Sequence, residues 1–251
     1  MKQRWDDLRA AVAFLTIFPV AETVTFDDRR LVRSMGLFPA VGLLLGLGLV
    51  ISNWLLTPLL PRAVLDGLLL LLLILATGAL HLDGVADLID GLAGSRDRET
   101  SLRIMKDSRV GAMGVVALVM LLLLKYLSLY QIPLEQKNAA LLLMPTAGRW
   151  CQVFLSRCST YIRAEGGTGS VFVDRVGNAE LLRASVTILL AVLLLFTFKG
   201  LLLAVLLLLF AALLMHYFER RLGGVTGDVL GAASEIVEVF TLLLILALYR
   251  G

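Results

Sequence analysis

The segment "GLLLLLLILATGALHLDGVADLIDG", residues 67–91, joins a long apolar run to a cluster of acidic residues. The apolar run, residues 68–80, contains no charged side chain, yet Asp83, Asp87 and Asp90 follow directly after it. Their spacing of i, i+4 and i+7 places the three carboxylates on one face of a helix. Because like charges on neighbouring turns repel each other, we expect a positive group between them.

The composition of the chain indicates a membrane protein. Of its 251 residues, 59% are hydrophobic and 17% are charged, whereas an ordinary soluble protein carries about 25% charged residues. The apolar residues fall into blocks that approach the roughly 17 to 25 residues needed to cross a bilayer. We therefore predict an all-α polytopic bundle of about seven transmembrane helices, forming one domain over residues 1–251. The predicted spans lie near residues 36–60, 64–82, 110–130, 138–156, 184–198, 201–218 and 229–249.

Three of these spans are irregular. The fifth and sixth are short and are divided only by Lys199 and Gly200, which predicts a tight helical hairpin. The fourth contains Pro145 and Arg149. It is therefore either a kinked span lined by polar groups or a re-entrant segment.

The distribution of Lys and Arg predicts the orientation in the membrane, because cytoplasmic loops are enriched in these residues. With a cytoplasmic N-terminus, most basic residues fall in cytoplasmic segments. Only Arg62, Lys137, Lys199 and Arg250 fall in loops on the opposite side. This orientation makes residues 81–109 and 157–183 cytoplasmic loops, which we expect to form the active site.

The first 35 residues do not have the pattern of a cleavable signal peptide. They begin with the charged sequence "MKQRWDDLR", and the apolar stretch that follows, residues 10–20, is short. We expect residues 1–35 to be an interfacial segment in which residues 10–20 form a helix along the membrane surface.

A second acidic set lies in "GGVTGDVLGAASEIVEVF", residues 223–240. Asp228, Glu235 and Glu238 are spaced i, i+7 and i+10, close to one helix face, and both glutamates lie inside the last apolar span. An ionised carboxylate inside a membrane helix costs roughly 2.5 kcal/mol or more, so such residues indicate a function.

The two acidic sets are compatible with three explanations. One or two divalent metal ions could lie between the two helices, and all-oxygen ligands favour hard ions such as Mg²⁺, Mn²⁺ or Ca²⁺. Alternatively, the carboxylates could line a proton or sodium pathway. The third explanation is structural, with the carboxylates forming salt bridges to nearby arginines.

The basic segment "GSRDRETSLRIMKDSRVGAMG", residues 94–114, favours metal-dependent phosphate chemistry. Lys106, Ser108 and Arg109 come just before the third span, so they can face the same cavity as the first acidic set. Ammonium and guanidinium groups beside a metal ion suit a diphosphate. Positive charges that only set the topology explain Arg96 and Arg98, but they explain the "KDSR" cluster less well.

Further basic residues fit the same cavity. Arg149 lies inside an apolar segment, where it requires an anionic partner or a polar cavity. Arg163 precedes the glycine-rich sequence "EGGTG", residues 165–169, which could bind phosphate through backbone N–H groups or simply be a flexible connector. His81 could act as a base, although a hydrogen-bonded structural role is the simpler interpretation.

Several motifs together closely resemble the cobalamin synthase family, also called adenosylcobinamide-GDP ribazoletransferases. They are "FLTIFPV" (14–20), "FPAVGLLLG" (38–46), "HLDGVADLIDGLAG" (81–94), "RIMKDSRVGAMG" (103–114), "GRW" (148–150) and "GGVTGDVLGAASEIVE" (223–238). The resemblance implies a Mg²⁺-dependent enzyme of the bacterial or archaeal cytoplasmic (inner) membrane. It would join adenosylcobinamide-GDP to α-ribazole or its 5′-phosphate and release GMP.

For this reaction we expect Asp83, Asp87, Asp90 and Asp228 to hold Mg²⁺ against the diphosphate. Lys106, Ser108, Arg109, Arg149 and Arg163 would bind phosphate. Glu235 and Glu238 could complete the metal shell, or one of them could take the hydroxyl proton. The expected partners are the corrinoid nucleotide, α-ribazole and the lipid bilayer, with no nucleic acid. Whether the chain forms a homo-oligomer is left open.

Two other classes of protein share some of these features. A CDP-alcohol phosphotransferase also has metal-binding aspartates on membrane helices, and "DGVAD" (83–87) is similar to the start of its motif, but Asp87 stands where that motif has arginine. A carboxylate-lined ion transporter would need no basic diphosphate-binding segment, and no inverted repeat is visible.

Overall fold

The computed structural model describes residues 2–20, 27–163 and 173–249. The regular secondary structure in these ranges is helical. The helices are α1 (Lys2–Leu15), α2 (Asp28–Met35), α3 (Phe38–Leu56), α4 (Arg62–Ala76), α5 (Leu80–Gly94), α6 (Arg98–Ile104), α7 (Ala112–Gln131), α8 (Leu134–Cys158), α9 (Asn178–Leu222) and α10 (Gly227–Tyr249). A single 3₁₀ turn, Val173–Arg175, precedes α9.

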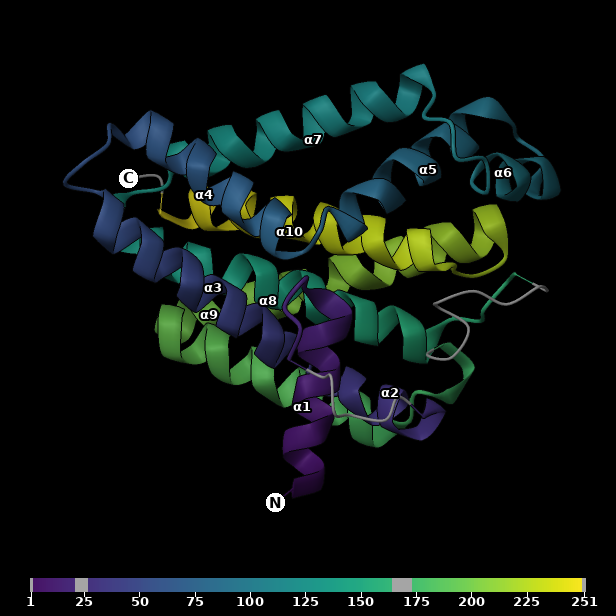
Figure 1. The fold of residues 1–251 in the computed structure, drawn as a ribbon, viewed down its shortest axis with the longest axis horizontal. Coiled ribbons are helices and arrows are strands. Elements are labelled where there is room, and N and C mark those ends of the chain that lie inside the picture. Colours follow the sequence, from purple (N-terminus) through teal and green to yellow (C-terminus); the bar gives the residue numbers. More distant parts are fainter. Residues whose placement is uncertain (1, 21–26, 164–172, 250–251) are drawn as a thin grey trace.

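Helices α8 and α10 form the centre of the bundle. Helix α8 packs against α3, α9 and α10, while α10 also packs against α5 and α7. Most helices run roughly along the long axis of the molecule, and α1 stands across them (Figure 1). Helix α8 is buried without interruption from residue 143 to residue 153. Polar side chains in this segment therefore need partners inside the protein.

Two glycines one helical turn apart bring α3 close to α8. A Cβ atom added at Gly42 would lie 2.6 Å from the carbonyl oxygen of Pro145, and one at Gly46 would lie 2.7 Å from that of Leu141. Small residues at this spacing allow the backbones of membrane helices to approach each other closely. Helix α8 continues through Pro145 as one helix of 25 residues, so the fourth predicted span is a continuous helix.

The structure confirms an all-α polytopic membrane protein. Among the described helices, α3, α7, α9 and α10 are long and apolar enough to cross a membrane, and α4 with α5 could form a fifth, bent span. Helix α8 is long enough but less apolar than these helices, and α9 is counted once although it is broken at Thr197. Four expectations stay predictions: the count of seven transmembrane helices, the cytoplasmic N-terminus, the single domain and the interfacial segment.

The second predicted span, residues 64–82, differs from the structure. Helix α4 ends at Ala76, and α5 begins at Leu80 at an angle of 90° to it. The bend is made by Gly78 and Ala79, which have φ angles of 60° and 57°. The segment 81–109, predicted as a loop, therefore contains helices α5 and α6.

The hairpin predicted around Lys199 and Gly200 agrees with the geometry of α9. Thr197 has non-helical backbone angles, with φ 52°. A Cβ at Gly200 would lie only 2.1 Å from the carbonyl oxygen of Val192, so the chain folds back on itself here. The other predicted loop, 157–183, is shorter than expected because α9 begins at residue 178. Its glycine-rich stretch, 165–169, lies outside the described residues.

Candidate active site

Helix α5 touches the start of α10 at a glycine. A Cβ atom added at Gly84 would lie 2.7 Å from the carbonyl oxygen of Asp228. This contact brings the first acidic set beside the first acidic residue of the second set. The carboxylate of Asp87 lies within electrostatic range of Asp83, Asp228 and Arg163. Three aspartates from the two acidic sets therefore lie close together, and their joint role in one site stays a prediction.

The charges in this group are only partly compensated. Arg163 donates a hydrogen bond to Asp228, and the Arg163 Nε atom has no hydrogen-bond partner within the described ranges. Among the described residues, none forms a hydrogen bond or an ion pair with the carboxylate of Asp83 or Asp87. Two carboxylates thus lack a partner among the described residues, and the Nε–H of Arg163 is buried without one.

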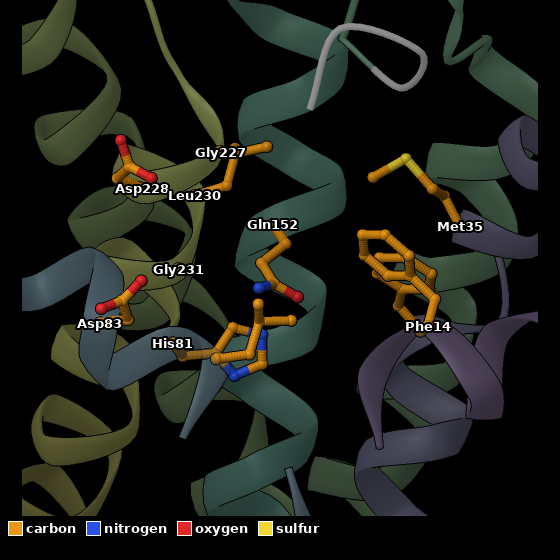
Figure 2. Close-up of a pocket in the computed structure, with 11 residues that line it drawn as sticks. Phe14, Met35, His81, Asp83, Gln152, Gly227, Asp228, Leu230 and Gly231 are labelled. Carbon is orange, nitrogen blue, oxygen red and sulfur yellow. The ribbon is translucent and has the colours of Figure 1, made fainter. Parts of the chain in front are cut away.

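A cavity of about 190 Å³ opens beside these carboxylates. Asp83 and Asp228 form one wall, His81 and Gln152 lie in the middle, and Phe14 and Met35 stand on the opposite side (Figure 2). The remaining lining residues are Phe38, Leu80, Gly227, Leu230 and Gly231. Helices from both ends of the sequence, α1 to α3 and α10, therefore meet at one cavity with an acidic wall and an apolar wall.

Asp90 has a different environment from the other two aspartates of α5. Its carboxylate accepts hydrogen bonds from the backbone N–H groups of Gly111, at 2.6 Å, and Gly114, at 2.8 Å. These groups belong to the first turn of α7, where no side chain of that turn provides a cap. Asp90 therefore caps α7 from a neighbouring helix. Its predicted role as a metal ligand stays a prediction.

The predicted phosphate-binding residues Lys106, Ser108 and Arg109 lie between α6 and α7 and are exposed. They lie next to Gly111 and so near the Asp90 end of α5. Hydrogen bonds from Arg109 lower the pKa of Asp107 to about 2. A phosphate that binds Arg109 would therefore have to compete with the Asp107 carboxylate.

The second acidic set contributes two glutamates to a buried ion-pair network. Lys125 on α7 lies 2.7 Å from Glu235 and 2.5 Å from Glu238, measured from Nζ to the nearest carboxylate oxygens. The guanidinium of Arg149 on α8 pairs with the other oxygen of Glu238. All four residues are at most 5% exposed, and their formal charges cancel. The structural explanation, salt bridges, thus describes Glu235 and Glu238.

Arg149 also connects this network to the cavity. Its Nη2 atom lies 3.3 Å from Nδ1 of His81, a residue that lines the cavity. Because a guanidinium only donates, His81 accepts at Nδ1 and carries its proton on Nε2. The phosphate-binding role of Arg149 and the catalytic roles of Glu235 and Glu238 stay predictions, since these groups already have partners.

The donor set fits a hard divalent cation in an open site. Within the described ranges, no three His, Cys, Asp or Glu side chains are arranged to enclose a metal ion. Mg²⁺, however, is usually bound by one or two carboxylates together with waters and substrate phosphates. Asp83, Asp87 and Asp228 could supply such carboxylates, and their uncompensated charge favours a cation.

The similarity of the chain to known proteins shows its family. A family model described as cobalamin-5-phosphate synthase matches residues 7–246. The chain belongs to this family. An adenosylcobinamide-GDP ribazoletransferase of Geotalea daltonii is 43% identical over 238 residues, which cover 95% of this chain and 96% of the relative. A relative with the same name from Desulforamulus reducens is 38% identical, and the match covers 96% of this chain and 96% of the relative. One from Pseudomonas fluorescens is 42% identical, and the match covers 93% of this chain and 96% of the relative. No solved structure matches the chain.

Membership of the cobalamin-5-phosphate synthase family confirms the family predicted from the motifs. The matched region contains both acidic sets, the basic segment and all residues that line the cavity. It also contains two residues that the sequence reasoning missed, Lys125 and Gln152. Lys125 could have been found, because a lysine within an apolar span requires an acidic partner. Gln152 gave no signal of its own, because it is uncharged and lies in a span already expected to carry polar groups around Arg149.

Proposed function

We propose that the chain is an adenosylcobinamide-GDP ribazoletransferase of a bacterial or archaeal cytoplasmic membrane. It would transfer the adenosylcobinamide phosphate moiety of adenosylcobinamide-GDP to α-ribazole or α-ribazole 5′-phosphate, and release GMP. The observation that carries this proposal is the pair of unpartnered carboxylates, Asp83 and Asp87, beside the Asp228–Arg163 ion pair. The names of its relatives, which share its length, support the choice of substrates.

In this reaction a hydroxyl oxygen of the ribazole attacks the phosphorus that bears the cobinamide. A new P–O bond forms, and the P–O bond to the GMP phosphate breaks. Asp83, Asp87 and Asp228 would hold Mg²⁺, which when bound neutralises charge on the diphosphate. Such transfers depend mainly on positioning and electrostatic stabilisation.

The residues of this chain supply the remaining functions. The unpartnered Nε–H of Arg163 would donate to a phosphate oxygen, where it offsets developing negative charge. Asp83 is exposed, so water reaches this side of the site and can take up the proton that the hydroxyl releases. Gly84 keeps α5 and α10 close enough for these groups to act on one diphosphate.

The proposed activity is tested with the full chain purified in detergent or in liposomes. Adenosylcobinamide-GDP and α-ribazole are added with Mg²⁺, and GMP and the corrinoid product are quantified. We expect equal amounts of GMP and cobalamin product, with no product after chelation of the metal. Folded, metal-loaded protein that releases no GMP would refute the proposal. Release of CMP from a CDP-alcohol would instead favour the lipid-synthesis alternative.

A further inference from the structure

The wall of the cavity opposite the carboxylates is aromatic and apolar. The rings of Phe14 and Phe38 lie 5.8 Å apart between centroids and are nearly parallel, with 16° between their planes. Met35 extends this wall, and Figure 2 shows Phe14 and Met35 facing the acidic side across the cavity. Flat aromatic rings and a thioether are favourable contacts for a planar ring.

Gln152 places an unsatisfied polar group in the middle of this cavity. The residue is only 5% exposed, and its Oε1 atom has no hydrogen-bond partner among the described residues. Leaving a buried carbonyl without a partner costs free energy, so such an atom usually meets a ligand or water. Since the two ends of a carboxamide can exchange places, Gln152 can offer either a donor or an acceptor to a ligand.

The cavity volume limits what part of a substrate can enter. Drug-sized ligands occupy pockets of about 300 to 1,000 Å³, whereas this cavity measures about 190 Å³. It has room for one ring system but is too small for a corrin macrocycle. The candidates for the occupant are therefore the guanine base of one substrate and the benzimidazole base of the other.

The polar groups of the cavity distinguish these two bases. Guanine presents several donors and acceptors along its edges, and an aromatic wall would leave most of them unsatisfied. The base of α-ribazole presents one unsubstituted ring nitrogen, which only accepts. The Gln152 amide can donate to this nitrogen while its carbonyl accepts from a ribose hydroxyl. His81 adds a donor at Nε2, since its Nδ1 accepts from Arg149.

We propose that the cavity bounded by Phe14, Phe38 and Gln152 is the subsite for the benzimidazole base of the acceptor. This inference rests on the proposed function, because it assigns one of the two substrates of that reaction to one place. With the base in the subsite, the attached ribose lies on the side of Asp83 and Asp228. The attacking hydroxyl is then presented to the diphosphate, and the donor substrate binds outside the cavity.

The subsite is tested by the substitution Gln152→Met, which removes both hydrogen-bonding ends and keeps a similar length. The affinity for α-ribazole is measured by equilibrium dialysis, without a donor substrate, on the full chain in detergent. We expect about tenfold weaker binding, the effect of losing one or two hydrogen bonds. The KM for α-ribazole should rise equally, while the KM for adenosylcobinamide-GDP stays unchanged. Gln131→Met, the same change at an exposed position at the end of α7, should have no effect.

The second variant is Phe14→Leu, which removes the ring but keeps an apolar side chain and should also weaken α-ribazole binding. If Gln152→Met does not fold, this variant decides the matter. Unchanged α-ribazole binding in the folded variants, or a rise in the KM for adenosylcobinamide-GDP alone, would overturn the subsite. The same holds if guanosine displaces α-ribazole better than 5,6-dimethylbenzimidazole does.

The two proposals fail in different ways. A wild-type protein that binds α-ribazole by dialysis but releases no GMP would refute the transfer reaction and retain the subsite. Normal turnover with unchanged α-ribazole kinetics in Gln152→Met would refute the subsite and retain the transfer reaction.

Discussion

Asp83 and Asp90 lie on one face of the same helix, but their surroundings give them different chemistry. Asp83 lines the cavity and has no partner among the described residues. Asp90 accepts two backbone N–H groups from the first turn of α7. Spacing alone grouped them as equivalent ligands, because the sequence does not show which of the two meets a helix N-terminus.

The substitution Asp90→Asn tests this distinction. Asparagine retains one acceptor oxygen but loses the negative charge that favours a helix N-terminus. We expect the free energy of unfolding to fall by about 1 kcal/mol, as for other lost caps. The Mg²⁺ concentration for half-maximal turnover should stay unchanged. The measurements are thermal unfolding in detergent and a Mg²⁺ titration of GMP release. Unchanged stability with a raised Mg²⁺ requirement would instead make Asp90 a metal ligand.

Among the helices, the close contact between α5 and α10 brings Asp83 and Asp87 near Asp228 in the candidate active site. Gly84 is the point where an added side chain would meet the backbone of Asp228. The variant Gly84→Ala should push the two helices apart and move Asp83 and Asp87 away from Asp228. Because misplacing reacting groups by about 1 Å can cost about 100-fold in rate, we expect a loss of turnover of this order in a folded protein.

Gly48→Ala is the matched control for this change. An added methyl group at Gly48, in the interior of α3, would meet no atom within 4 Å. This variant should retain wild-type turnover and gain slight stability, since alanine is the better helix former. Equal turnover of Gly84→Ala and the wild type would show that the close contact of α5 with α10 is not needed.

The buried network joins α7, α8 and α10. Lys125→Met would leave Glu235 and Glu238 with only the Arg149 cation, and removing one partner of a buried ion pair costs about 3 to 5 kcal/mol. The double variant Lys125→Met with Glu235→Gln restores the charge balance and should recover part of this loss. Denaturant unfolding of the single and double variants in detergent measures the coupling. Strictly additive effects would show that the network contributes no coupling energy.

For the whole molecule, the sequence predicts well those membrane spans that can be recognised from the length of an apolar segment. The spans near 36–60, 110–130 and 229–249 correspond to α3, α7 and α10. The bend between α4 and α5 was missed because Thr77, Gly78 and Ala79 carry no charge that would interrupt the apolar run. Positive φ angles at Gly78 and Ala79 turn the chain there.

The candidate site was also predicted only in part, because local patterns do not show which distant segments of the chain meet. Helical spacing placed Asp83 and Asp87 together, and the motifs indicated the family. The pairing of Lys125 with Glu235, however, joins residues 110 positions apart and depends on how α7 packs on α10. The cavity likewise needs Phe14, Gln152 and Asp228 to meet from three distant helices, which no local pattern can indicate.

We expect the transfer to depend most directly on Asp83 acting with Mg²⁺. GMP release from adenosylcobinamide-GDP and α-ribazole is titrated with Mg²⁺ for the wild type, Asp83→Asn and the control Asp28→Asn, which alters an exposed ion pair with Arg175. We expect turnover in the wild type and the control to rise with Mg²⁺ and to vanish with chelator. Asp83→Asn should lose at least about 100-fold in turnover, as when an essential electrostatic group is removed. Its melting temperature should not fall, since no partner among the described residues is lost. Normal turnover in folded Asp83→Asn, or turnover in chelator, would contradict the account.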